Sequence, residues 1–345
     1  MREGRYKPLP YVAERYQWDG RSEYTQWWFF DGEFESGHRV MTIMMPRMFG
    51  AVEDDDNGPD PGITLAVVEP GPVAHRSHAY YPGEFSADES GMRMSFGEDF
   101  ASFEDGRYRV RALQGNLGFD LEYRPLLPPW PPFPGRAGFM ARPLLWTLAP
   151  EKYFHYASMV PRGAVEGRLS LPGGEVAVSG VGYHEQGRTD ARFQGLFSYW
   201  YWNRFFLGDW TFIFPVAQAP RRAMNATMRA LLVYRGEECM ADIFDVTGLL
   251  LRHRVLEYQE HTPSGRRLPK RAHFEARWRG TDLHVEMELG QEIEAFRFQA
   301  FGETSALQPV WAQHVMRVGA SGRVAGERVD LQGEGVFESM LTGSE

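Results

Sequence analysis

The stretch Glu175-Val176-Ala177-Val178-Ser179-Gly180-Val181-Gly182-Tyr183-His184-Glu185-Gln186 joins two patterns that matter for the whole chain. Its first half alternates apolar residues with small or polar ones, and a period of two is typical of a β-strand. Its second half places a histidine and a carboxylate beside a tyrosine. We therefore expect a strand that leads into a cluster of ionisable side chains.

The same alternation recurs along the chain in short segments bounded by Gly, Pro or Asp. The segments expected to be strands are 40–45, 63–68, 108–112, 117–123, 165–171, 175–181, 210–214, 230–234, 272–278, 283–289, 295–301 and 310–318. Turn residues join several of them, at Glu104-Asp105-Gly106, Pro172-Gly173-Gly174, Arg279-Gly280-Thr281-Asp282 and Ala320-Ser321-Gly322-Arg323. Helical spacing is visible only at 221–228, so the sequence predicts an all-β fold of the barrel or sandwich type.

The length of the chain and a proline-rich segment indicate two such units. A chain of 345 residues is longer than a usual single core. We expect an N-terminal β domain over residues 1–150 and a C-terminal β domain over 151–345, joined by the Pro-rich segment 126–148. A stiff strap packed over the core is the preferred interpretation of this segment, and peripheral contact with a membrane surface is the alternative.

Composition excludes several classes of partner. The net charge of −9, without a long Lys/Arg cluster, argues against nucleic acid, which requires a basic face. The single cysteine, Cys239, allows no intramolecular disulfide and no cysteine-based metal site, and a buried thiol is the favoured interpretation. The N-terminus lacks the apolar core of a signal peptide, and no apolar run is long enough to span a bilayer, so we expect a cytoplasmic protein.

Two further clusters are rich in aromatic residues. Gln26-Trp27-Trp28-Phe29-Phe30-Asp31 lies near the start, and Tyr199-Trp200-Tyr201-Trp202-Asn203-Arg204 precedes Leu207-Gly208-Asp209-Trp210. Consecutive tryptophans in a strand must point to opposite faces, so one can pack in a core while the other faces a neighbour or a cavity. Many rings with few polar groups are typical of a pocket for a large apolar ligand.

These blocks, in this order, resemble the lipocalin-like carotenoid hydratase (hydroxyneurosporene synthase) family. Gln26-Trp27-Trp28-Phe29 is similar to its Glu-Trp-Trp-Tyr signature, and Gly180-Val181-Gly182-Tyr183-His184-Glu185 to its Gly-x-Gly-Tyr-His-Asp segment. Trp200–Arg204 and Leu207–Asp209 are similar to the Trp-x-Trp-Gly-Arg and Gly-Asp that follow. The resemblance implies two lipocalin-like β-barrel domains with ligands held in or between them, an architecture that fungal decalin-forming Diels-Alderases resemble.

The chain departs from the family where hydration chemistry would be carried. After the shared histidine, members that hydrate their substrate have an acidic residue followed by His, Asn and Trp, whereas this chain has Glu185, Gln186, Gly187 and Arg188. A Tyr-x-Asp pair of the family is absent from 212–216. Hydration of an alkene requires a positioned acid, which here would be Glu185, Asp209 or Asp31. Cyclisation or isomerisation requires mainly a shaped pocket and a hydrogen-bond donor.

The sequence therefore predicts a cofactor-independent enzyme that cyclises or isomerises a long apolar polyene of polyketide or isoprenoid origin. A hydratase or lyase and a non-catalytic lipid carrier are the alternatives. The residues expected to be catalytic are Tyr183, His184, Glu185 and Arg188. Those expected to contact substrate are Gln26, Trp27, Trp28, Asp31, Gln186, Trp200, Trp202, Arg204 and Asp209.

Each of these residues also has a structural interpretation. His184 could be a core histidine bonded to a backbone carbonyl, Arg204 and Asp209 could form a buried ion pair, and the tryptophans could be core. No metal site is expected, because 53–60 lacks the distal Glu of a calcium loop and the His75/His78 pair has no third ligand at a useful spacing.

Overall fold

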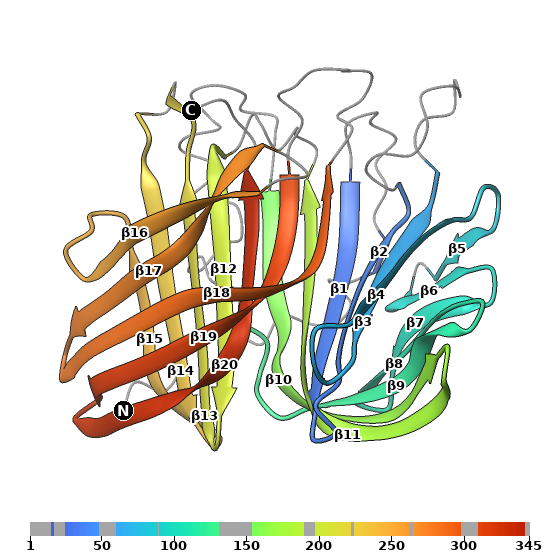
Figure 1. Cartoon of the computed structure of the whole chain (residues 1–345), viewed down its shortest axis with the longest axis horizontal. Coiled ribbons are helices and arrows are strands. Elements are labelled where there is room, and N and C mark those ends of the chain that lie inside the picture. The colour runs from blue at the N-terminus through green and yellow to red at the C-terminus, as the bar shows by residue number, and fades with distance from the viewer. Residues whose placement is uncertain are drawn as a thin grey trace. The chain divides into compact units, whose positions relative to one another are not determined.

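The computed structural model describes residues 15–16, 25–47, 60–88, 90–130, 154–189, 197–221, 224–261, 265–297 and 310–341. Within these ranges the regular structure is two antiparallel β-sheets and contains no α-helix (Figure 1). The prediction of an all-β fold is therefore confirmed.

The first sheet has its strands in the order β4-β3-β2-β1-β11-β10-β9-β8-β7-β6-β5. Sequence neighbours pair except at β4 and β5, which are the two edge strands. The pairing of β1 with β11 brings the first and last strands of this unit together. The strands are β1 (Thr25–Phe34), β2 (Arg39–Met45), β3 (Gly62–Val68), β4 (Ala74–Tyr80), β5 (Phe85–Ala87), β6 (Arg93–Phe96), β7 (Asp99–Glu104), β8 (Arg107–Gln114), β9 (Leu117–Pro125), β10 (Phe154–Leu171) and β11 (Gly174–Thr189).

The second sheet repeats the plan, in the order β15-β14-β13-β12-β20-β19-β18-β17-β16. Its first and last strands, β12 and β20, pair with each other at the centre. The strands are β12 (Tyr199–Leu207), β13 (Trp210–Gln218), β14 (Thr227–Arg235), β15 (Glu238–Asp245), β16 (Leu251–His261), β17 (Arg266–Trp278), β18 (Thr281–Arg297), β19 (Val310–Val324) and β20 (Glu327–Leu341).

Each sheet curls around its own apolar core. In the first, Ile63 of β3 and Val110 of β8 belong to one buried cluster, and the Gln114 side-chain amide donates to the Ile63 carbonyl at 3.3 Å. In the second, the rings of Phe214 on β13 and Phe274 on β17 lie 4.7 Å apart between centroids, and Figure 1 shows β16 to β18 passing across β13 to β15. Curling buries one face of each sheet without covering helices.

The predicted domain boundary near residue 150 is wrong in position. Strands β10 and β11 pair with β9 and β1, so the first sheet continues to Thr189. The Pro-rich segment therefore connects two neighbouring strands of one sheet and does not join two domains. Trp130 at its start is buried and pairs with Ser158 of β10, whereas residues 131–153 lie outside the described residues. Among the described residues, no helix is long and apolar enough to cross a membrane.

Three of the four quoted turns are correct, and the fourth is wrong. Residues 105–106, 172–173 and 279–280 close hairpins, but Ala320–Arg323 lies inside β19, and the turn is Ala325-Gly326. Gly322 has φ of +121°, and a Cβ there would meet the backbone carbonyl of Asp282 on β18. Gly322 therefore allows β19 to lie close to β18 within the sheet. In the sequence, a glycine at such a position resembles a turn glycine.

Asp245 holds the connection from β15 to β16, the two edge strands of the second sheet. It is buried, and its carboxylate accepts hydrogen bonds from the backbone N–H groups of Thr247, Gly248, Leu250 and Leu251 and from the Thr247 hydroxyl, at 2.6–3.1 Å. Burial alone raises the pKa of Asp245, but the hydrogen bonds from Thr247, Leu251 and Leu250 outweigh it, so this pKa lies below its ordinary value.

We predict that Asp245→Asn lowers the free energy of unfolding by about 2 kcal/mol, because bonds to a charged acceptor are lost. Since the folded pKa is depressed, the stability that Asp245 contributes is present above its unfolded pKa of about 3.9 and is lost as pH falls below it. Urea unfolding at pH 7 and at pH 3 measures this. Asp330→Asn, on the exposed β20 face, is the control, and equal effects of the two variants at pH 7 would contradict the prediction.

Candidate functional site

The pairing of β1 with β11 brings two of the sequence clusters directly together. In this register Trp27 faces Gly187, Trp28 faces Gln186, Phe29 faces Glu185, Phe30 faces His184 and Asp31 faces Tyr183. Directly paired residues of an antiparallel sheet share a face, whereas successive residues alternate. The predicted site residues are therefore divided between two faces of the sheet and cannot all contact one ligand.

The first face points into the core and carries Trp28, Phe30, His184 and Gln186, all of them buried. The His184 ring stacks on Phe30 with centroids 3.9 Å apart and planes 3° apart, and its Nδ1 lies 2.8 Å from the Phe29 carbonyl oxygen. Tyr108 adds an edge contact at 4.6 Å. His184 thus has the surroundings of a core histidine bonded to a backbone carbonyl. Trp28 lies in the same core.

The opposite face carries Trp27, Phe29, Tyr183 and Glu185, which are also buried. The Tyr183 hydroxyl donates to Glu185 Oε2 at 2.7 Å, and the Tyr156 hydroxyl from β10 donates to the same oxygen. We call Glu185, Tyr156 and Tyr183 the carboxylate cluster. A buried carboxylate is costly unless hydrogen-bonded, and the two phenols on one oxygen meet part of that demand.

Aromatic rings enclose the carboxylate cluster. Trp27 lies against Tyr156 at 6.2 Å between ring centroids, and Phe29 lies against Tyr183 at 6.2 Å. Gly187 is required here, because a Cβ at this position would collide with the Trp27 ring. The position of the Trp27 ring therefore explains why Gly187 stands where the carotenoid hydratase pattern has Asn.

Gln26, Gln186 and Arg188 lie on the core side, with Arg188 near the end of β11. The Gln26 amide donates to the Arg15 carbonyl at 3.0 Å, whereas neither end of the Gln186 amide has a hydrogen-bond partner among the described residues. Arg188 is paired with His155 across β10. Burial, helped by the nearby Arg188 charge, lowers the pKa of His155 to about 4, so this imidazole is neutral at neutral pH.

In the second sheet, Trp200, Trp202 and Arg204 alternate with the core residues Tyr201 and Phe205 and are buried on the opposite face. The Trp200 indole N–H donates to Oε1 of Glu338 on β20 at 3.2 Å, and Glu338 is buried and pairs with Trp202. The sheet thus repeats the pattern of the first, with tryptophan and a buried carboxylate on the face away from the core.

The expected buried ion pair of Arg204 with Asp209 is wrong. Asp209 lies in the turn between β12 and β13 with a side chain 57% exposed, and its Oδ2 pairs with Arg235 Nε at 3.1 Å. The Gly208-Asp209 turn displaces Asp209 from the strand face that Arg204 occupies. An exposed, ion-paired carboxylate is poorly placed to protonate a buried alkene, which leaves Glu185 and Asp31 as the buried acids of the predicted set.

Sequence reasoning missed Tyr156 and Glu338. Tyr156 lies in Phe154-His155-Tyr156, directly after the Pro-rich segment, and alternation within this run could have placed it on one face with Ser158. Glu338 lies in β20, whose polar alternation was not assigned to a strand. Neither lies in a recognisable motif, so only the pairing of distant strands identifies them.

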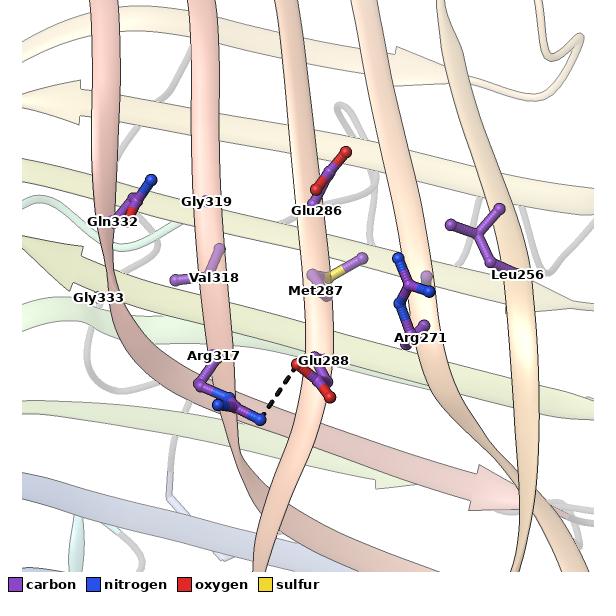
Figure 2. A pocket seen from close by; sticks show the side chains of 11 residues that line it. Leu256, Arg271, Glu286, Met287, Glu288, Arg317, Val318, Gly319, Gln332 and Gly333 are labelled. Atoms are coloured by element: carbon purple, nitrogen blue, oxygen red, sulfur yellow. Dashed lines mark ion pairs between the residues drawn. The ribbon is translucent and has the colours of Figure 1, made fainter.

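Two surface hollows lie elsewhere. One of about 630 Å³ is on the first sheet, over Arg109, Asp120, Glu122 and Glu166, and one of about 530 Å³ is on the second (Figure 2). The residues that line them include none of the predicted site residues. Their polar linings do not suit a long apolar ligand.

We predict that His184→Ala lowers the free energy of unfolding by about 3 kcal/mol, because it removes a buried stacked ring and a backbone hydrogen bond. His38→Ala, in the β1–β2 turn, is the control and should change stability by less than about 0.5 kcal/mol. Chemical denaturation measures both. A neutral His184→Ala would show that the ring is not part of the core.

We also predict that His155 makes the fold sensitive to acid. Its pKa is about 4 when folded and about 6.5 when unfolded, so the unfolded state binds the proton first and stability falls as pH drops across that window. The difference of about 2.5 units corresponds to about 3 kcal/mol. His155→Gln should therefore flatten the pH dependence of unfolding between pH 7 and 4. Identical pH profiles for this variant and the unaltered protein would contradict this.

Comparison with known proteins places the fold. No family model and no curated protein sequence matches the chain. Among solved structures, a protein of Nitrosomonas europaea described as an AttH has a TM-score of 0.69 at 14% identity, over 97% of this chain and 98% of that one. CghA has a TM-score of 0.63 at 12% identity, over 98% and 96%. Kievitone hydratase from Nectria haematococca has a TM-score of 0.61 at 13% identity, over 98% and 94%. The chain therefore has the lipocalin-like two-sheet fold of these proteins, as the resemblance predicted.

Proposed function

We propose that the chain is a cofactor-independent enzyme that rearranges the bonds of a long, apolar, conjugated small molecule by isomerisation or intramolecular cyclisation. The observation that carries this proposal is the carboxylate cluster, in which buried Glu185 accepts from Tyr156 and Tyr183 beside Trp27 and Phe29. It combines a proton-transfer group with aromatic surface. The names of two structures of the same fold, CghA with bound Sch210972 and kievitone hydratase, support an enzyme of small-molecule metabolism.

The hydrogen bonds of the cluster favour a base over a pre-formed acid. Both phenols donate to Glu185 Oε2, which stabilises the charged carboxylate. In an isomerisation, Glu185 would remove a proton from a carbon next to the conjugated system and return it to another carbon, so no atom is gained or lost. In a cyclisation, a phenol that turns from Glu185 to a substrate carbonyl would polarise the reacting diene partner.

Hydration is the second candidate, and the same carboxyl group favours it. Once protonated, Glu185 could deliver its proton to an alkene carbon, and the rings of Trp27 and Phe29 could stabilise the cation before water adds. This reaction requires a water molecule to be incorporated, whereas the first does not. A carrier function would use the aromatic surface alone and would have no need of a buried carboxylate.

The test is the product formed by the full-length protein from the apolar compound that co-purifies with it, identified by mass spectrometry. We expect a product of unchanged mass, which gains deuterium from heavy water if Glu185 moves a proton. Glu185→Gln should lower the rate by about a hundredfold or more, and Tyr156→Phe by about tenfold or more. Glu175→Gln, at the exposed start of the same strand, is the control.

The alternatives give different results. A product heavier by one water, with the oxygen of labelled water, would replace the proposal with hydration. Ligand that is bound and returned unchanged by the unaltered protein would indicate a carrier. A Glu185→Gln variant as active as Glu175→Gln would remove the carboxylate cluster from the chemistry.

A further inference from the structure

The outward face of the β17–β18 hairpin carries two histidines and several carboxylates. Ala272, Phe274 and Ala276 of β17 point into the core, so the alternating residues His273 and Glu275 point outward. On β18, His284 pairs directly with Glu275 and therefore shares that face. These three side chains come from adjacent strands whose register is continuous over residues 271–278.

The three side chains converge closely. One ligand atom from each of His273, Glu275 and His284 lies within 4.8 Å of the others. The two imidazole rings are nearly parallel, 11° apart, with centroids separated by 5.6 Å, and His273 Nδ1 is 3.5 Å from Glu275 Oε1. The side chains of His273 and Glu275 are only 21% and 14% exposed, so neighbours restrict their rotamers, whereas the 38% exposed His284 can adjust.

We propose that His273, Glu275 and His284 form a binding site for one divalent transition-metal ion, with zinc as the expected occupant. Two imidazoles and one carboxylate match the ligand preference of zinc, cobalt and nickel, whereas calcium and magnesium require more oxygen ligands. Three protein ligands leave a coordination position for water or another molecule. Small rotations are sufficient to bring ligand atoms now within 4.8 Å to metal-binding distance.

Charges on the same face disfavour a hard cation more than a nitrogen-preferring metal. Arg252 and Arg254 of β16 pair with Glu275 and His273, Arg277 Nη2 lies 3.9 Å from Glu275 Oε2, and Arg323 pairs with Asp282. A hard cation that depends on net negative charge would be disfavoured beside four arginines. Asp282 Oδ1 lies 3.6 Å from His284 Nε2 and places a second carboxylate beside the His284 ring.

An open hollow lies next to this site. Glu286 pairs with His273 across the hairpin and lines the hollow of about 530 Å³ together with Arg271, Glu288, Arg317 and Gln332. Figure 2 shows Glu286 beside this lining and the ion pair of Arg317 with Glu288, whose atoms lie 3.1 Å apart. The hollow therefore begins one paired residue away from His273, although none of the three proposed ligands lines it.

The test is titration of the full chain, freed of metal with chelator, with zinc chloride in a calorimeter. We expect one ion per chain with a dissociation constant in the micromolar range or tighter. His273→Ala and His284→Ala should each weaken binding by about tenfold or more, because each removes a ligand. Arg277→Gln should bind zinc at least as tightly as the unaltered protein, because it removes a cation that competes for Glu275. Magnesium should give no heat of binding.

The control is His75→Ala. His75 Nε2 lies 2.5 Å from Glu69 Oε1 in the first unit, and among the described residues this pair has no third metal ligand close by. The variant should therefore bind zinc as the unaltered protein does. Circular dichroism verifies that each variant is folded. Glu275→Gln is a conservative change of the third proposed ligand. Absence of zinc binding at about 100 micromolar, or unchanged affinity in both histidine variants, would overturn the proposal.

Discussion

The antiparallel pairing of β1 with β11 is the constraint on which the rest of the first unit depends. It joins segments that lie about 150 residues apart in the chain, as the His184 contact with the Phe29 carbonyl shows by its separation of 155 residues. Because the side-chain period of a strand is two, this register puts Phe30 and His184 in the core and Phe29 and Glu185 on the other face. A slip of β11 by one residue would turn Glu185 into the apolar core and His184 to the opposite face.

The two faces of β11 place the neighbouring residues His184 and Glu185 in different surroundings. His184 is held between Phe30 and Tyr108 and fixes the register from the core side, while Glu185 next to it holds the hydroxyls of Tyr156 and Tyr183 on the opposite side. Adjacent residues of one strand can therefore belong in turn to the apolar core and to a buried polar cluster. The same logic separates Trp28, a core residue, from Trp27, whose ring requires Gly187 opposite it.

Local patterns were sufficient to predict the all-β fold but not its pairing. Alternation identified most strands and, at Trp27 and Trp28, the two opposed faces. It missed β4 to β7, β12, β15, β16 and β20. It also split β18, where the register shifts between Leu289 and Glu294. The domain boundary was misplaced because proline-rich composition does not distinguish a linker from a long connection within one sheet. Tyr156 joined the carboxylate cluster through pairing that no local pattern encodes.

Each sheet buries charged side chains on the face opposite its apolar core, and burying a charged side chain costs free energy. Glu185 in the first sheet, and Arg204 and Glu338 in the second, lie at most 2% exposed on faces where apolar side chains would be less expensive. Hydrogen bonds from Tyr183 to Glu185 and from Trp200 to Glu338 offset part of that free-energy cost. His184 differs, because its ring stacks on Phe30 within the core cluster as a hydrophobic side chain would. Buried charge beside aromatic side chains is thus a feature of both units, and in the first unit it is the feature that the proposed function uses.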